Sequence, residues 1–298
     1  MGIVTAIFSI RRVLGRSSDR LNAGKTKQAG KKGVRDNFRQ RSGLGDDGEA
    51  RFALIVAGKA LRDPVGHGPT STLRSCRRSA ARGAAGNNRL PCFLDDEDRQ
   101  RYLQCLRQAL LRFGCRLHAY VLMSNHVHLL LTPEETGGVS RLMHTFARNY
   151  VGSFNGRHGR TGTLWEGRFK ACLVDSGRYF LTCSRYIELN PVRAWMVARP
   201  DEHAWSSYGA NAEGRPDPLL APHPEYLGLG TDPASRASAY RALFAEALPD
   251  DLVEEIRIHL QQQKVLGTDR FRSWVEERTG RFATVRPAGR PPAGPNCP

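Results

Sequence analysis

The apolar pattern changes its period several times between residues 96 and 190, and these changes constrain the fold more than any other feature of the chain. Residues 96–113 carry apolar side chains at helical spacing, with acidic residues in the first turn and Gly114 after the last turn. Residues 116–123 and 126–132 follow as two apolar runs around a short polar turn. The pattern therefore predicts a helix and then a β-hairpin.

The apolar period continues to change beyond the hairpin. Helical spacing returns over residues 139–154, a short strand is predicted over 169–174, and a helix is predicted over 177–190, which we expect Pro191 to end. One more strand before the first helix would complete a ferredoxin-like α+β layer, with an antiparallel sheet and helices on one side. We expect this domain to span residues 86–210.

The segments outside this domain have a different composition. Residues 1–85 mix Gly, Ser, Arg and Lys without a sustained period, so we expect poor order there. A loop rich in Pro and Gly predicts a linker over 211–233. The remainder predicts a small helical module over 234–285, with helices near 234–248, 252–263 and 269–279, and a disordered Pro-rich tail over 286–298.

The chain is strongly basic. Its 45 Lys and Arg against 29 Asp and Glu give a net charge of +16, with a pI near 10.1. Such an excess favours a polyanionic partner, nucleic acid above all, although a merely solvated basic surface is the alternative. No apolar run is long enough for a transmembrane helix, and no basic amphipathic helix has a clean apolar face, so we expect no membrane partner.

The cysteines indicate a reducing compartment. The 7 cysteines form an odd set without a C-x-x-C pair or a spacing typical of a zinc site. The apolar start of the chain is followed, not preceded, by basic residues and has no small-residue cleavage site, which is unlike a secretory signal. We therefore expect reduced thiols and a cytoplasmic protein.

Two histidines stand in the second hairpin strand. Side chains alternate across a strand, so His126 and His128 project from the same face, about 6.5–7 Å apart along the backbone. Two imidazole nitrogens could then converge on one metal ion. Taken alone, this pattern more often marks hydrogen-bonded structural histidines than a metal site, so it needs a partner elsewhere.

The helix that we expect Pro191 to end supplies that partner. Tyr186 and Asn190 are four residues apart and share one helical face. If this face packs over the histidine strand, the Asn190 oxygen can complete a three-ligand set beside the Tyr186 phenol. Such a site suits phosphodiester cleavage, with the phenol attacking in line to give a 5′-phosphotyrosine and a free 3′ hydroxyl. The alternative for Tyr186 is a core aromatic.

Basic side chains cluster around these residues in the sequence. We expect them to contact phosphates, with a solvated basic rim as the alternative. Trp165 is a candidate for stacking on an unpaired base, with a core position at least as common. We expect His118, Tyr150 and Tyr179 to be structural. The basic candidates are Arg157, Arg160, Arg168, Lys170, Arg178 and Arg185.

Four motifs in this region resemble one family. YVLMSNHVHLLL over 120–131, LWEGRFKA over 164–171, RYIELNPVRA over 185–194 and WSSY over 205–208 are similar to the REP-associated tyrosine transposases and related single-tyrosine HUH transposases. The resemblance implies the HUH fold and a strand transferase acting on single-stranded or hairpin DNA, either as a monomer or as a homodimer.

The same resemblance implies roles for individual residues. The histidines of the family's HUH strand, which bind Mg²⁺ or Mn²⁺, fall on His126 and His128. The nucleophile falls on Tyr186, and the further polar ligand falls on Asn190.

The chain departs from the family before the first helix. Members begin with a strand that carries a Y-H-V-x-x-R-G-N-like run, whereas residues 78–89 keep only its last positions and residues 70–77 have little strand character. An out-of-frame or misannotated start would explain this departure and would leave the sheet without its central strand. The rival hypothesis is a catalytically inactive DNA-binding relic. An RNA-binding ferredoxin-like module is disfavoured, because no strand carries an RNP-type aromatic run.

Overall fold

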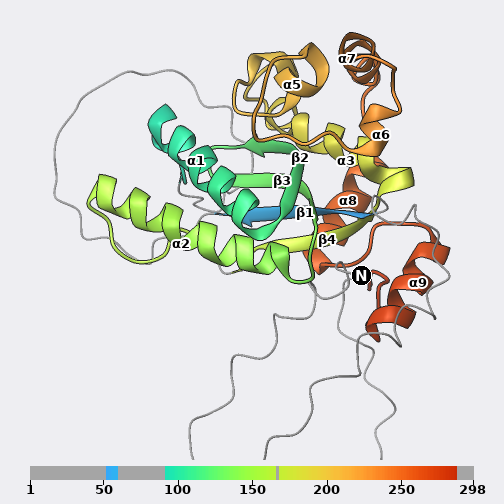
Figure 1. Ribbon diagram of the computed structural model, residues 1–298, viewed down its shortest axis with the longest axis horizontal. Helices are drawn as coiled ribbons and strands as arrows, with labels where there is room; N and C mark the ends of the chain where they lie inside the picture. Colours follow the sequence, from blue (N-terminus) through green and yellow to red (C-terminus); the bar gives the residue numbers. More distant parts are fainter. Residues whose placement is uncertain (1–51, 60–90, 166–167, 287–298) are drawn as a thin grey trace, which may run out of the picture.

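The computed structural model of the chain describes residues 52–59, 91–165 and 168–286 (Figure 1). Its sheet and first helices follow in the order β1 (Phe52–Lys59), α1 (Asp96–Phe113), β2 (Cys115–Leu122), β3 (His126–Pro133), α2 (Gly138–His158) and β4 (Lys170–Asp175). The strands are antiparallel neighbours in the order β2-β3-β1-β4. This is the ferredoxin-like α+β arrangement predicted from the sequence, and the prediction is confirmed.

The central strand of this sheet is β1, so the sheet does not lack the central strand that an altered start would have removed. β1 pairs with β3 on one side and with β4 on the other. A strand between two helical layers reads as a short apolar run without alternation, and FALIVAGK is such a run. Such a run has no sustained period, so the sequence pattern does not mark it as a strand. The rest of the segment expected to be poorly ordered, residues 1–51 and 60–85, lies outside the described residues.

Helices α1 and α2 lie side by side over one face of the sheet (Figure 1). α1 begins where the Asp95 carboxylate accepts from the backbone amide of Asp98 and ends at Gly114, whose φ of 55° closes the helix in the left-handed region. Its bounds match the predicted helix. Between these helices and the sheet lies an apolar core that includes Tyr102, Leu129 and Phe146.

The opposite face of the sheet is covered by α3 (Ser176–Glu188) and α8 (Asp250–Gln262). The predicted placement of the helices on one side is therefore wrong, because apolar side chains on both faces of the sheet need cover. Their shared core contains Leu130 of β3, Ile187 of α3 and Ile256 of α8. α3 ends at Glu188, three residues before Pro191, and the short helix α4 (Asn190–Arg193) begins after Leu189. The proline is tolerated in α4 because it stands in the first turn, where a backbone N–H has no helical partner.

The predicted linker over 211–233 is a packed part of the domain. It follows the 3-10 turn η2 (Pro200–Glu202) and contains the end of α5 (Tyr208–Glu213) and α6 (Pro224–Leu227). The amide of Ala221 donates to the carbonyl of Leu117 at 2.8 Å, and the Tyr120 hydroxyl donates to Asp217 at 2.9 Å. The segment thereby covers the β2 edge. Backbone hydrogen bonds can hold an aperiodic chain in place, and composition does not reveal them.

The C-terminal helices also belong to this body instead of forming a separate module. They are α7 (Pro233–Ala242), α8 and α9 (Asp269–Thr279). Leu266, between α8 and α9, donates to Leu173 of β4 at 2.8 Å and accepts from Asp175 at 2.9 Å. Both edges of the sheet are thus covered, which protects them from pairing with other chains. The predicted tail beyond residue 286 is not described.

A buried carboxylate links these layers. Glu188 at the end of α3 is fully buried and accepts hydrogen bonds from Ser207, from Asn211 at 2.9 Å and from the Tyr240 hydroxyl at 2.8 Å. Its three donors satisfy the carboxylate and join α3 to α5 and α7.

Among the described helices, none has the length and apolar character needed to cross a membrane.

Candidate active site

The two histidines of β3 face α3. Val127, Leu129 and Leu131 point into the core under α1 and α2, so strand alternation turns His126 and His128 to the other face. Their ring centroids are 5.2 Å apart and the rings are perpendicular. The sequence prediction that both imidazoles share a face is therefore confirmed.

His128 is suited to bind a cation. Its side chain is buried, and its Nδ1 atom has no hydrogen-bond partner. Burial lowers the pKa of His128 well below its usual value, and the nearby His126 lowers it further. The ring is consequently neutral, and a neutral imidazole keeps a lone pair for a metal ion. A ring nitrogen of His126 lies 2.7 Å from the Asn125 side-chain oxygen, a contact that orients the outer imidazole.

Tyr186 packs directly against this pair. Its ring centroid lies 5.9 Å from that of His128, in an edge-to-face contact, and the side chain is only 4% exposed. The expected packing of the Tyr186 face over the histidine strand is thus observed. Burial raises the pKa of the Tyr186 phenol, so the group is a protonated phenol until something compensates the charge of the phenolate.

Asn190 lies beside Tyr186, through a contact that the sequence did not predict. Its amide nitrogen donates to the backbone carbonyls of Tyr186 at 2.9 Å and Ile187 at 3.3 Å. The amide oxygen is left as the atom that can act as a ligand. Among the described residues, no cluster of three His, Cys, Asp or Glu side chains could hold a metal. A cation here would therefore rest on two imidazoles and an amide oxygen, a donor set that fits Mn²⁺ or Mg²⁺.

The sequence reasoning missed one group at this site. The guanidinium carbon of Arg193 lies 4.5 Å from the Tyr186 ring centroid, and a terminal nitrogen of Arg193 donates to the Tyr186 carbonyl. Its position in the sequence could have identified it. Arg193 stands seven residues, or two helical turns, after Tyr186, so a helix continuing past Pro191 would place both residues on the same face.

Lys170 is the predicted phosphate contact that the sheet places nearest the histidines. In the sheet register, Ala57 of β1 lies between Lys170 of β4 and His128 of β3. Residues opposite one another in a sheet point to the same face, and the Lys170 side chain is exposed. A phosphate near the histidine pair is therefore within the region that this cation can reach.

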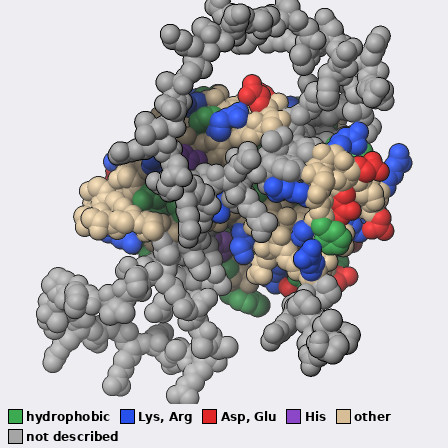
Figure 2. Space-filling view, turned by 90° about the horizontal axis from the view of Figure 1, so that it is seen from below, with side chains coloured by type: hydrophobic (Ala, Val, Ile, Leu, Met, Phe, Trp, Pro, Cys, Tyr) green, Lys and Arg blue, Asp and Glu red, His purple; other side chains and the backbone are tan. Residues whose placement is uncertain are grey.

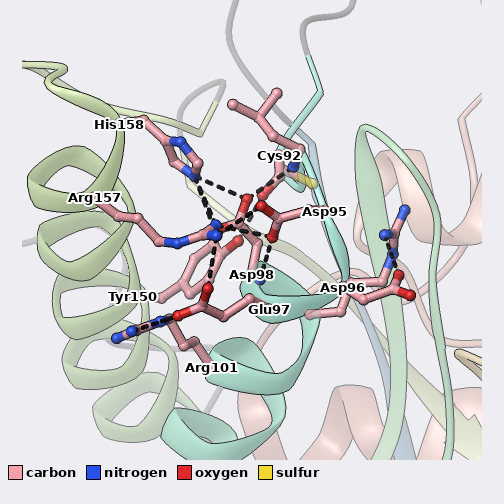
Figure 3. Close-up of polar contacts among 11 residues, drawn as sticks. Cys92, Asp95, Asp96, Glu97, Asp98, Arg101, Tyr150, Arg157 and His158 are labelled. Carbon is pink, nitrogen blue, oxygen red and sulfur yellow. Dashed lines mark hydrogen bonds and ion pairs between the residues drawn. The ribbon is translucent and has the colours of Figure 1, made fainter.

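Arg157, by contrast, is engaged by carboxylates, which argues against its predicted role in binding phosphate (Figure 3). Its guanidinium donates to Asp95, Asp98 and Glu97 at 2.7–2.8 Å. The hydrogen bonds to Asp95 contribute most to raising the pKa of Arg157. Acidic side chains are concentrated at the N terminus of α1, so Arg157 at the end of α2 pairs with them. These hydrogen bonds hold the two helices together.

Arg185 is also engaged, in this case with the C-terminal helices. It donates to the backbone carbonyl of Glu246, and its guanidinium lies over the Phe244 ring. Arg160 lies over Phe154 at the end of α2, and Arg178 lies over Tyr179 on α3. The basic candidates therefore do not form one continuous patch, and Figure 2 shows Lys and Arg side chains distributed over the face in view. Arg168 is exposed near the start of β4.

The residues expected to be structural are packed as predicted. The Tyr150 hydroxyl donates to the carbonyl of Cys92 at 2.6 Å inside the core. Trp165 packs against Tyr102 and Tyr150, which favours its core alternative over base stacking. His118 is buried between the carbonyl of Ala221 and the hydroxyl of Thr132.

Part of the chain matches the model of a known family. Residues 85–190 match the family model described as "Transposase IS200 like". A solved structure titled "Structure of the REP associates tyrosine transposase bound to a REP hairpin" matches with a TM-score of 0.35 and 16% identity, covering 58% of this chain and 86% of that one. No curated protein matches the chain. The segment that carries the histidine pair, Tyr186 and Asn190 is therefore the part of the chain that matches the IS200-like transposase family model.

Proposed function

We propose that the chain is a transposase that cuts and rejoins single-stranded or hairpin DNA through a covalent phosphotyrosine at Tyr186. The contact between the Tyr186 ring and the neutral, buried His128 carries this proposal, because it joins a nucleophile to a ligand for the cation that phosphoryl transfer requires. The family match over the same residues and the net charge of +16 support it.

The proposed reaction needs no nucleotide hydrolysis. The Tyr186 oxygen forms a bond to phosphorus while the bond from phosphorus to the 3′ oxygen breaks, and that oxygen leaves with the electron pair. The phenol proton is lost and the 3′ oxygen gains one, so the products are a 5′-phosphotyrosine and a 3′ hydroxyl. The aryl ester keeps the bond energy, and a DNA 3′ hydroxyl can reverse the attack to rejoin strands.

The surrounding residues support each part of this step. Mg²⁺ or Mn²⁺ held by His126, His128 and Asn190 would supply polarisation of the phosphoryl oxygens. Burial of the Tyr186 side chain against His128 excludes water and fixes the phenol on α3. Lys170 is positioned to contact a backbone phosphate from the same face of the sheet.

The rival proposal is a DNA-binding relic without catalysis. It was motivated by a sheet without its central strand. Because β1 fills that position and pairs on both sides, the support for the histidine strand is present. The structure thus removes the main reason to favour the relic, and covalent chemistry remains the property that separates the two proposals.

The test is a covalent adduct assay with matched tyrosine variants. A labelled oligonucleotide is incubated with protein and Mn²⁺, separated on a denaturing gel and mapped by mass spectrometry. Tyr186→Phe should fold and bind DNA like the wild type yet form no adduct, since only the nucleophilic oxygen is removed. Tyr179→Phe, on the same helix, should keep the adduct. An adduct that persists in Tyr186→Phe would overturn the assignment, and no adduct in the wild type would favour the relic.

A further inference from the structure

Arg193 is a half-buried cation that no carboxylate pairs with among the described residues. Its Nε and Nη1 atoms are buried and have no hydrogen-bond partner, while Nη2 donates to the Tyr186 carbonyl. The pKa of Arg193 is lowered to about 10, mainly by burial, with a smaller contribution from the positive charge of Arg257. Burying guanidinium donors without hydrogen-bond partners costs free energy, and an anion bound beside them would offset this cost.

A second guanidinium acts on the same phenol from a distant part of the chain. Arg257 of α8 lowers the pKa of the Tyr186 phenol through its positive charge and a side-chain hydrogen bond. Its own neighbour Ile256 is fully buried in the core that includes Tyr186 and Ile187, and this packing holds α8 against α3. The Arg257 side chain is 51% exposed, with Glu254 3.7 Å away as a loose ion-pair partner.

The two positive charges repel one another, yet both act on Tyr186. Each lowers the pKa of the Tyr186 phenol and so favours an anion there. Burial disfavours the charged form of Arg193, and a bound anion would offset that cost. Planar guanidinium forks match the oxygens of a phosphate diester. In phosphoryl transfer, negative charge is carried by the non-bridging oxygens, which are the atoms that such forks stabilise.

We propose that Arg193 and Arg257 together bind the phosphate that Tyr186 attacks, so that α8 completes the active site. The inference rests on the proposed function and extends it, because it assigns a catalytic contact to the C-terminal helices. These helices lie outside the segment that matches the transposase family, residues 85–190. The ligand class is a phosphate diester or, in its absence, inorganic phosphate.

The first experiment measures single-turnover adduct formation. Arg193→Gln should slow it roughly a hundredfold or more, and Arg257→Gln roughly tenfold or more, because each removes charge at the reacting phosphate. Arg270→Gln is the matched control: Arg270 is an exposed residue of α9, and the variant should stay within about twofold of the wild type. Melting curves verify that each variant folds. Wild-type rates in Arg257→Gln would overturn the role of α8.

The second experiment is independent of catalysis. Side-chain ¹⁵N NMR follows the Nε–H signals of the arginines while inorganic phosphate is added, and Arg193→Lys and Arg257→Lys assign them because lysine keeps the charge and removes the signal. Both signals should shift with phosphate in the wild type. If neither shifts and both Gln variants react normally, the phosphate site is refuted while the transposase function stands. If both shift but no adduct forms, the phosphate site stands and the catalytic function fails.

Discussion

Burial fixes the protonation of the groups around Tyr186. His128 is neutral, because its charged form is desolvated and lies beside His126. A neutral imidazole binds a cation without first losing a proton. The same burial raises the pKa of the Tyr186 phenol, so cations around this oxygen are needed before it becomes a good nucleophile.

Loss of the histidine pair should remove cation binding. We expect the His126→Ala, His128→Ala double variant to weaken Mn²⁺ binding by at least roughly tenfold, because two of the three proposed ligands are gone. Isothermal titration calorimetry measures this affinity. His144→Ala removes an exposed histidine of α2 and should bind Mn²⁺ like the wild type. Equal affinity in the double variant and the wild type would eliminate the site.

His118 makes the stability of the fold dependent on pH. Burial lowers its pKa to about 4, and Arg116 adds to this effect, while the ring of His223 lies 5.0 Å away. The folded protein therefore binds fewer protons than the unfolded chain between pH 4 and 6.5. Stability from His118 is present above pH 6.5 and is lost as the pH falls toward 4, amounting to about 3 kcal/mol in total.

We therefore expect His118→Asn to flatten this dependence. Asparagine can still donate to the Ala221 carbonyl and does not titrate. Urea unfolding at pH 4.5 and pH 7 should show a smaller difference in unfolding free energy for the variant than for the wild type. His144→Asn, at an exposed position, should leave that difference unchanged. An unchanged difference in His118→Asn would mean that other groups cause the loss of stability in acid.

At the scale of elements, Arg157 stabilises the packing of α1 against α2 and is not available to bind a substrate. Asp98 is 1% exposed and accepts from Arg157 at 2.7 Å and lies 2.9 Å from His158. A buried carboxylate needs such partners. The hydrogen bonds join the start of one helix to the end of the other, as Figure 3 shows.

Replacing Arg157 should therefore affect stability and not DNA binding. Arg157→Ala is expected to lower the melting temperature by several degrees, because it leaves the buried Asp98 with fewer donors. Its affinity for hairpin DNA should stay within about twofold of the wild type. Lys170→Ala, an exposed position on the histidine face, should show the reverse behaviour. Weaker DNA binding by Arg157→Ala at a wild-type melting temperature would contradict this assignment.

For the whole molecule, we expect net charge to govern the proposed association with DNA. With a charge of +16, binding should release counterions from the backbone, so affinity for hairpin DNA should fall by roughly a hundredfold or more between 50 and 200 mM salt. Fluorescence anisotropy measures this slope. Hairpin-bearing single strands should bind better than a blunt duplex of equal length. A flat salt response, or a preference for the duplex, would count against the proposed substrate.

The sequence alone determined the local elements and the identity of the candidate site. The bounds of α1 and the hairpin follow from apolar spacing, an acidic first turn and Gly114, all of which are local signals. Strand alternation was enough to place His126 and His128 on one face. Helical spacing placed Tyr186 and Asn190 on one face of the predicted helix, but the packing of that face over the histidines was only a condition, which the structure meets.

Tertiary structure alone decided which distant segments complete the sheet and the site. β1 is identified as a central strand by its pairing with β3 and β4, and pairing between strands far apart in the chain leaves no periodic signal in an eight-residue apolar run. The partners of Arg157 and the approach of Arg257 to Tyr186 likewise depend on how α2 and α8 pack. Charge in a sequence predicts an ionic partner, but only three-dimensional proximity decides whether that partner is a carboxylate of the fold or a phosphate of the substrate.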